Sequence, residues 1–464
     1  MNAIVDAGSF RDPAGRVFAA GEQIFRTVMP DVAHDYERFR DGGLMHDLIG
    51  KGLLVGASEA EAHGLGNLAR GSAYVLEHPR VPFISYPYEW SFSLHKRAAL
   101  HHLDVHLAAL DAGFTLVDAT AYNIQFDGTR PLFIDHLSFR DYREGEIWRG
   151  HRQFCMQFLN PLLLTAYLGL PANSWFRGSL EGIAPEELAP LLSWRHNLSW
   201  TVLTHVTAQA ALHRRSLRAG APSSSRTPTL PLTALRGMLE GLRRFIAKLE
   251  PKAARTVWGD YAGDNSYADA EAAAKRAFVG EMVAAVKPGL LFDIGCNSGD
   301  YSEAAFDAGA RRIVGFDFDH GALEHAFRRF DGTATPFLPL WLDAANPSPA
   351  QGWAQSERKG LAERAKADAL VALAFVHHIA IARNVPMDMV LDWLLAMAPM
   401  GVIEFPPKSD PMVQRLLAQR EDIFPHYSEE AFLALLGARA RIVRSQHLSE
   451  NGRLLVWYDR SRSG

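Results

Sequence analysis

Acids and glycines that could surround a nucleotide-type cofactor gather at residues 293–300, where the chain reads Asp-Ile-Gly-Cys-Asn-Ser-Gly-Asp. An apolar run precedes this stretch and a helix-like segment follows it. Glycines at 295 and 299 let the backbone approach a ligand, because a side chain there would collide with it. The start of a helix adds unpaired N–H groups, and Asp293 can accept from a hydroxyl or cationic group. The pattern therefore predicts a strand, a tight turn and a helix start.

Two further acids follow the next buried runs. Asp317 ends the run 313–317 and precedes Phe318, and Asp343-Ala344 follows a third run. An acid in the position of Asp317, past a glycine turn, commonly accepts hydrogen bonds from both ribose hydroxyls of an adenosine. Asp343 can accept from the exocyclic amine of adenine, and the backbone N–H of Ala344 can face a ring nitrogen. A solvated helix cap at Asp317 and a plain turn at Asp343 are the structural alternatives.

These parts, in this order, resemble the class I S-adenosylmethionine-dependent methyltransferases over roughly residues 258–458. The Gly-x-x-x-Gly turn fits that family better than the Gly-x-Gly-x-x-Gly of dinucleotide dehydrogenases. The resemblance implies an α/β fold with a doubly wound, mostly parallel seven-stranded sheet, and S-adenosylmethionine as cofactor. A similar fold whose glycines serve packing alone is the alternative. The cofactor residues implied are Asp293, Gly295, Asn297, Gly299, Asp317, Phe318, Asp343 and Ala344.

Three side chains are candidates for the catalytic step. His377 and His378 follow a fourth buried run, and a histidine there could deprotonate a hydroxyl because its pKa lies near working pH. In the resembled family such a pair is also structural, near the methionine moiety. Glu404 ends a strand and is a candidate base or acceptor contact. Residues 368–371 lack the Asn-Pro-Pro-Tyr pattern of exocyclic-nitrogen methylation, which argues against an adenine or glutamine amide acceptor. We expect a small-molecule or glycan-type acceptor.

A finer resemblance comes from residues 420–428, together with 258–261 and 265–267. These segments are similar to a bacterial group related to the nodulation protein NoeA. The residues themselves do not state that group's substrate.

The first half carries a different constellation: Asp118, Asn123 and a strand-terminal Asp135. This set resembles the catalytic and metal-binding loops of protein-kinase-like phosphotransferases. The resemblance implies that Asp118 orients an acceptor hydroxyl, while Asn123 and Asp135 hold magnesium against the phosphates of ATP.

The first half also departs from that pattern. No His-Arg precedes Asp118, and residues 136–137 are His-Leu rather than Phe-Gly. Residues 15–21 are a loose substitute for a glycine-rich loop. Arg26 stands where the family has lysine, with Glu37 as its expected partner, and arginine does not replace lysine freely.

Several interpretations therefore stay open for the first half. It could be an active phosphotransferase, a degenerate kinase-like domain that binds or presents the methyl acceptor, or a domain in which Asp118 and Asn123 cap turns. For the whole chain, the rivals are a phosphotransferase whose second domain only binds a nucleoside, and a non-catalytic partner protein.

Composition divides the chain. Residues 218–231 are rich in proline, serine and small residues and are predicted to be a linker. We expect an α+β domain over 1–217 and the methyltransferase-like domain with a leading helix over 232–464. The last two predicted strands should form an antiparallel edge pair. The expected strands are 290–294, 312–316, 337–342, 369–373, 400–405, 440–445 and 454–458.

The bulk numbers describe an ordinary folded protein of 464 residues with a formal net charge of −4. This charge argues against nucleic acid as the main partner. The two cysteines, the lack of a signal-peptide pattern and the lack of a long apolar run favour a cytoplasmic protein without a membrane span. No metal-ligand spacing is evident in the second half, and the sequence does not indicate an oligomeric state.

Overall fold

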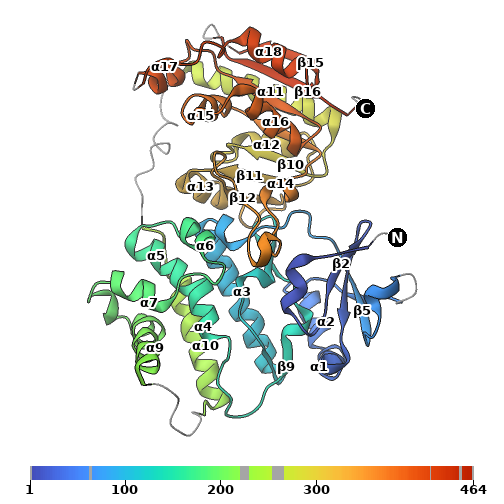
Figure 1. Cartoon of the computed structure of the whole chain (residues 1–464), viewed down its shortest axis with the longest axis vertical. Helices are drawn as coiled ribbons and strands as arrows, with labels where there is room; N and C mark the ends of the chain where they lie inside the picture. Colours follow the sequence, from blue (N-terminus) through green and yellow to red (C-terminus); the bar gives the residue numbers. More distant parts are fainter. Residues whose placement is uncertain are drawn as a thin grey trace. The chain divides into compact units, whose positions relative to one another are not determined.

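A computed structural model describes residues 3–61, 65–219, 229–252, 266–418, 420–448 and 452–461. The chain divides into two compact units, which Figure 1 colours along the sequence. Unit 1 comprises residues 1–126, 130–254 and 350–358, and unit 2 comprises 127–129, 255–349 and 359–464. Most of the predicted linker, residues 220–228, lies outside the described residues.

Unit 2 is built on a seven-stranded sheet of order β12-β11-β10-β13-β14-β16-β15. Strands β10 to β14 pair in parallel, whereas β16 is antiparallel to both β14 and β15. The predicted antiparallel edge pair is thereby confirmed. The strands are β10 (Leu291–Ile294), β11 (Ile313–Asp317), β12 (Phe337–Trp341), β13 (Ala369–Ala372), β14 (Met400–Phe405), β15 (Arg441–His447) and β16 (Leu454–Asp459).

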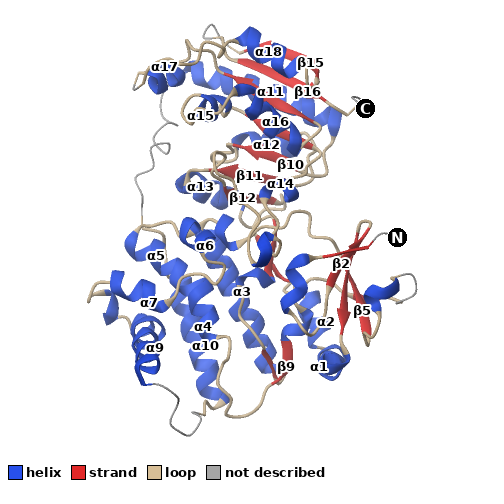
Figure 2. Cartoon of the chain, in the orientation of Figure 1, coloured by secondary structure: helices blue, strands red, loops and turns tan. Residues whose placement is uncertain are grey.

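The central strands are apolar because helices cover the sheet, and Figure 2 shows the sheet between helices. Every residue of β10 and β13 is buried, as expected for parallel strands covered on both faces. The helices are α11 (Ser266–Val286), α12 (Asp300–Asp307), α13 (His320–Phe330), α14 (Leu361–Arg364), α15 (Val376–Ala380), α16 (Met387–Met397), α17 (Pro411–Leu417) and α18 (Glu429–Gly437).

Unit 1 begins with a five-stranded antiparallel sheet of order β1-β2-β3-β5-β4. Two short two-stranded sheets follow: β6 pairs with β9 in antiparallel fashion, and β7 pairs with β8. The strands are β1 (Ala3–Val5), β2 (Val17–Ala20), β3 (Gln23–Val28), β4 (Ser58–Glu59), β5 (Tyr74–His78), β6 (Phe114–Leu116), β7 (Ile124–Asp127), β8 (Arg130–Phe133) and β9 (Phe139–Asp141). Residues 15–21 therefore contain strand β2 and do not form the glycine-rich loop that the sequence suggested.

The rest of unit 1 is helical. Helix α3 runs through its middle and buries eleven side chains. Two turns, Cys155–Leu159 and Leu203–Thr207, are π-helical. The helices are α1 (Pro30–Asp41), α2 (Leu44–Gly50), α3 (Phe92–Asp111), α4 (His151–Phe154), α5 (Asn160–Leu168), α6 (Asn173–Gly178), α7 (Pro185–Leu188), α8 (Trp200–Val202), α9 (Ala208–Ala219) and α10 (Leu232–Ala247).

Helix α10 belongs to unit 1 rather than leading into the second unit, which differs from the boundary expected at residue 232. Its apolar face, Leu235, Leu239, Leu242 and Ile246, is buried, and it packs against α3. Arg243 also pairs with Asp104 of α3, at 3.2 Å between Nη2 and Oδ2. The amphipathic face that suggested a leading helix is thus buried within unit 1.

Among the described residues, no helix is both long and apolar enough to cross a bilayer.

Candidate functional site

The turn after β10 has the backbone that its glycines predict, but one of the two glycines is needed for a different reason. Gly295 and Gly299 have φ of +81° and +82°, which a residue with a side chain rarely adopts. A Cβ on Gly299 would lie 2.6 Å from the ring of Phe330. Gly299 therefore lets helix α12 start against the core, rather than opening space for a ligand. Asn297 also has a positive φ, +48°.

Asp293 lies at the end of β10 and is buried, with 2% of its surface exposed. Its Oδ2 accepts a hydrogen bond of 2.6 Å from Ser302 Oγ of α12. Burial raises the pKa of Asp293 to about 7, although the Ser302 hydrogen bond lowers it. This carboxyl group ties the strand to the helix behind the glycine turn.

Asp317 lies at the end of β11, directly beside that turn. Its Oδ2 accepts from the backbone N–H of Asn297 at 2.8 Å, and its Oδ1 accepts from that of Asp319 at 2.8 Å. Burial raises its pKa, against the lowering effect of these backbone donors. Each oxygen of a carboxylate can accept about two hydrogen bonds. Asp317 is thus oriented by the backbone with acceptor capacity remaining for hydroxyl groups.

An exposed aromatic ring follows Asp317. Phe318 has 54% of its surface exposed, and the Arg383 guanidinium lies 6.0 Å from its ring centre. The same guanidinium lies 3.9 Å from Asp343 Oδ1, and the backbone N–H of Ala345 donates to that oxygen at 3.1 Å. Phe318 and Asp343, predicted separately, are therefore linked through Arg383. Ala344 lies in the turn after Asp343.

His377 and His378 lie in the short helix α15, which follows β13, and not at a strand end. Their rings are 4.0 Å apart. Burial lowers the pKa of His377 to about 2, helped by His378, Arg453 and Lys275, and lowers the pKa of His378 to about 4. Both imidazoles are neutral near pH 7, and such weakly basic groups are poor proton acceptors.

Glu404 is fully buried on β14 and has partners for both carboxylate oxygens. Its Oε1 lies 2.9 Å from Lys275 Nζ and 2.9 Å from Arg453 Nη1, and its Oε2 accepts from the backbone N–H of Ala374 at 2.8 Å. Arg453 continues to Asp410, at 2.6 Å. The geometry supports a structural ion-pair role for Glu404 more than the predicted role as a base.

Unit 1 brings its own predicted residues together. Asn123 Nδ2 donates to Asp118 Oδ1 at 3.2 Å and to Asp135 Oδ2 at 3.1 Å. Ser138 Oγ also donates to Asp118 Oδ1, at 3.0 Å. Burial and the nearby Asp135 raise the pKa of Asp118 to about 7. The Asn123 amide therefore lies within hydrogen-bonding distance of both acids.

Arg26 joins this cluster, but not through the expected partner. Its Nη1 lies 2.8 Å from Asp135 Oδ1 and its Nη2 lies 2.6 Å from Asp12 Oδ2. Glu37 instead accepts from Tyr74 Oη at 2.7 Å. The expected Arg26–Glu37 pair is therefore wrong: the connection between β1 and β2 brings Asp12 to the guanidinium, and Tyr74 on β5 takes Glu37.

Sequence reasoning missed Arg383, Lys275, Arg453 and Ser138. Each reaches its partner through the fold, from an element distant along the chain. A buried cation opposite Glu404 could have been suspected, because a fully buried carboxylate needs a partner. Nothing in the local sequence marks Arg383.

No family model matches the chain. The chain is 47% identical over 459 residues to the nodulation protein NoeA of Rhizobium meliloti (strain 1021), covering 98% of this chain and 96% of that protein. It is also similar to the crystal structure of the N-methyltransferase NodS from Bradyrhizobium japonicum WM9, at 14% identity and a TM-score of 0.31, over 42% of this chain and 98% of that one. For the crystal structure of NodS in complex with S-adenosylhomocysteine, the sequence identity is 14% and the TM-score is 0.32. That match covers 45% of this chain and 94% of the NodS chain.

Proposed function

The chain belongs to the family of the nodulation protein NoeA, and we propose that its unit 2 is a methyltransferase that uses S-adenosylmethionine. The acceptor is a small molecule or a glycan-type hydroxyl. Unit 1 assists acceptor binding or carries a second activity.

One observation carries this proposal: the Asp317 carboxylate is fixed by the backbone N–H groups of Asn297 and Asp319 at the mouth of the glycine turn. Ligands of open α/β sheets bind beyond the carboxyl ends of the strands. An oriented carboxylate there suits the two ribose hydroxyls of the cofactor. The exposed ring of Phe318 next to it offers an apolar face for adenine.

The residues at this edge of the sheet fit the cofactor in order. Asp317 would hold the ribose, Phe318 and Asp343 would contact adenine, and the turn at Gly295 would lie against the methionine part. When bound, the cofactor supplies an activated methyl group on its sulfonium. The protein mainly supplies proximity and orientation for an in-line displacement, which can contribute about 7–11 kcal/mol.

The proton of a hydroxyl acceptor needs a base, and neither histidine is well suited to that task. His377 and His378 are held neutral but weakly basic by burial and neighbouring cations. We infer that they are structural residues near the methionine part of the cofactor. Glu404 forms ion pairs with Lys275 and Arg453. Through Lys275 it links strand β14 to helix α11.

Calorimetry tests the proposal directly. S-adenosylmethionine and S-adenosylhomocysteine should bind the full chain with low-micromolar dissociation constants, about −7 to −8 kcal/mol. Absence of heat and of a thermal shift at roughly millimolar ligand, well above that range, would refute the proposal. Transfer itself is tested with a methyl-labelled cofactor, by following the label into small-molecule and oligosaccharide pools.

A second candidate function concerns unit 1, and the meeting of Asp118, Asn123 and Asp135 favours it. Asp118, with a pKa raised to about 7, is suited to act as a general base toward a hydroxyl. Asn123 and Asp135 would then hold magnesium on ATP, as the kinase-like resemblance implies.

The Arg26–Asp135 ion pair opposes that activity, because the guanidinium takes the acid that a magnesium ion would need. We therefore favour a degenerate domain that binds or presents the acceptor. Calorimetry with ATP, with and without magnesium, separates the two. Magnesium-dependent turnover of ATP that is lost in Asp118→Ala would overturn our preference. Failure to bind at any magnesium level would support it.

A further inference from the structure

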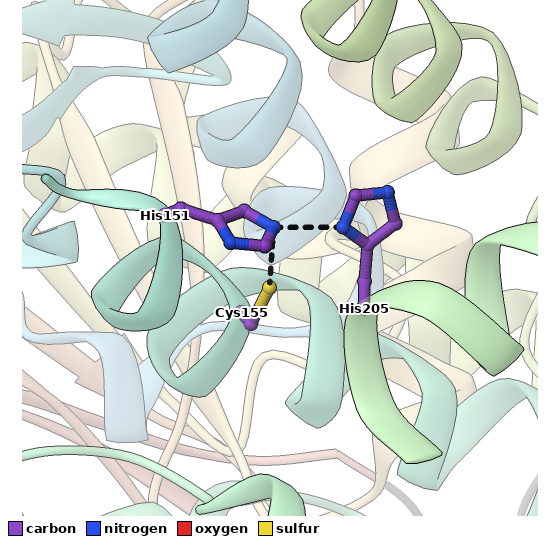
Figure 3. Close-up of side chains that lie close together, drawn as sticks. All are labelled: His151, Cys155 and His205. Atoms are coloured by element: carbon purple, nitrogen blue, oxygen red, sulfur yellow. Dashed lines mark hydrogen bonds between the residues drawn. The ribbon is translucent and has the colours of Figure 1, made fainter. Parts of the chain in front are cut away.

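Unit 1 gathers one thiol and two imidazoles at a place that neither candidate site uses. His151 Nε2 lies 2.7 Å from His205 Nδ1 and 3.7 Å from Cys155 Sγ. The three donor atoms all lie within 4.8 Å of one another. Figure 3 shows the rings and the sulfur turned toward one point. Three ligand-type atoms converging in this way are the starting condition for a metal site.

Two helical segments deliver these groups in pairs. His151 and Cys155 are one helical turn apart, and so are His205 and Gln209, which places each pair on one helix face. Cys155 begins one π-helical turn, and His205 lies within the other. Single π turns are rare and are frequent at functional sites. Both π turns of the described chain therefore coincide with this cluster.

Burial affects the pKa of the two imidazoles and that of the thiol in opposite directions. Burial lowers the pKa of both imidazoles to about 4 and raises the pKa of the fully buried Cys155 thiol to about 12, so the thiol stays protonated until a metal ion displaces its proton. Both rings are thus neutral near pH 7 and carry a lone pair each, as metal ligands must. A hydrogen bond between His151 Nε2 and His205 Nδ1 needs only one proton and one lone pair. It therefore does not use the Cys155 sulfur, which also faces the two rings.

Gln209 gives a second, independent sign. Its buried Oε1 has no hydrogen-bond partner among the described residues, although such atoms are normally paired. Its Nε2 lies 3.2 Å from His151 Nδ1 and 3.4 Å from Cys155 Sγ. Because the two ends of an amide have nearly the same shape, a half-turn brings the unpaired oxygen into the cluster as a fourth ligand.

We propose that His151, Cys155 and His205 bind a Zn²⁺ ion, with the Gln209 amide oxygen or a water molecule in the fourth position. Two imidazole nitrogens and one thiolate suit borderline-soft zinc, whereas magnesium and calcium prefer oxygen ligands. Binding transfers the Cys155 thiol proton to solvent and forms a zinc–thiolate bond. With Zn–N bonds of about 2.0–2.1 Å, a tetrahedral ion needs the two nitrogens about 3.3 Å apart, so the rings separate slightly. The ion joins the segment starting at His151 to the one containing His205.

Cobalt reports on this site in the full, tag-free protein after removal of bound metal with a chelator. Addition of Co²⁺ should give tetrahedral d–d bands and a near-ultraviolet thiolate-to-cobalt charge-transfer band that saturate at one equivalent. Zn²⁺ should displace them. Cys155→Ser should abolish the charge-transfer band, and His205→Ala should weaken Co²⁺ binding by at least about tenfold, since even outer-shell changes cost about 10–100-fold.

Matched controls decide which residues bind. The chain has two cysteines, so Cys296→Ser removes the other thiol and should leave the band intact. His213 is exposed on α9, and His213→Ala should leave the affinity unchanged. Should Cys155→Ser not fold, wild-type protein still gives a decision, because its melting temperature should rise with Zn²⁺ and not with Mg²⁺. Absence of the band and of the zinc shift, or loss of the band in Cys296→Ser alone, would overturn the proposal.

Discussion

The guanidinium of Arg26 lies 2.8 Å from the carboxylate of Asp135, and both side chains are largely buried. The same guanidinium reaches Asp12 at 2.6 Å. One cation is therefore shared by two acids of unit 1. The Arg26–Asp135 ion pair joins strand β3 to the segment between β8 and β9. The guanidinium balances the negative charge of Asp135, which a bound metal ion would otherwise balance.

Removal of this cation should be costly. Breaking a buried pair by deleting one partner leaves an uncompensated charge, at about 3–5 kcal/mol. Arg26→Ala should therefore lower the free energy of unfolding by about that much in urea titrations. The control is Arg80→Ala, because Arg80 pairs with Glu22 at 3.6 Å on the surface and should cost under about 1 kcal/mol. Equal effects of the two variants would contradict the role given to Arg26.

Cofactor binding should depend on Asp317. Asp317→Ala removes the acceptor for two hydroxyl groups, each charge-assisted bond contributing roughly 1.5–3 kcal/mol. The dissociation constant for S-adenosylmethionine should rise at least about tenfold in calorimetry. Asp307→Ala, which removes an exposed acid of the same unit, should leave it unchanged. Unaltered affinity in folded Asp317→Ala protein would mean that the ribose is held elsewhere.

The sequence predicted this edge of the sheet well, because the signals are local. Strand β10, the positive φ of Gly295 and the acid at the end of β11 all follow from a few adjacent residues. What it could not predict depends on distant partners. The Phe330 ring leaves no room for a side chain at position 299. Lys275 and Arg453 balance the buried charge of Glu404. All three partners come from elements distant along the chain.

Unit 1 was predicted less completely for the same reason. Residue type and spacing indicate Asp118, Asn123 and Asp135. The pairing of Arg26 with Asp12 depends on how strands β1 to β3 pair, and strands of three or four residues leave little pattern in the sequence. The grouping of Cys155 with His205 needs two helices to meet, and periodicity alone does not indicate which helices do.

Acid should destabilise the protein from about pH 6.5 downward. Burial lowers the pKa of His102 far below its usual value and that of His106 to about 3. An unfolded histidine takes up a proton near pH ~6.5, which the folded state excludes, so stability is lost as pH falls through that value. Asp118 and Asp293 have pKa values raised to about 7, so they add stability as the pH falls through that value. The buried histidines outnumber them, and the net effect of acid is destabilising.

His102 offers a specific test of this pH dependence. Its ring nitrogens have no hydrogen-bond partner among the described residues, and the rings of Phe154 and Phe158 surround it. His102→Phe should reduce the slope of unfolding free energy against pH, between about pH 5 and 6.5, by up to about 1.4 kcal/mol per pH unit. His46→Gln, an exchange of an exposed histidine, is the control. An unchanged slope in His102→Phe would show that another group carries the titration.

Limited proteolysis should cut preferentially within residues 218–231, where small residues, prolines and serines predominate in the sequence. After the cut, the two fragments should still elute together from a native sizing column. Helix α10 lies beyond the cut, and its buried face packs against α3 of the other fragment. Separation of the fragments without denaturant would contradict the assignment of α10 to unit 1.

Residues 350–358 interrupt the chain of unit 2 between β12 and β13 and are part of unit 1. There Glu357 forms a two-pronged ion pair with Arg11, at 2.9 and 3.1 Å, and Arg358 lies 4.1 Å from the ring centre of Tyr122. A single cut of the chain therefore cannot separate the two units from each other. The similarity to the Rhizobium meliloti relative covers 98% of this chain and so runs through both units.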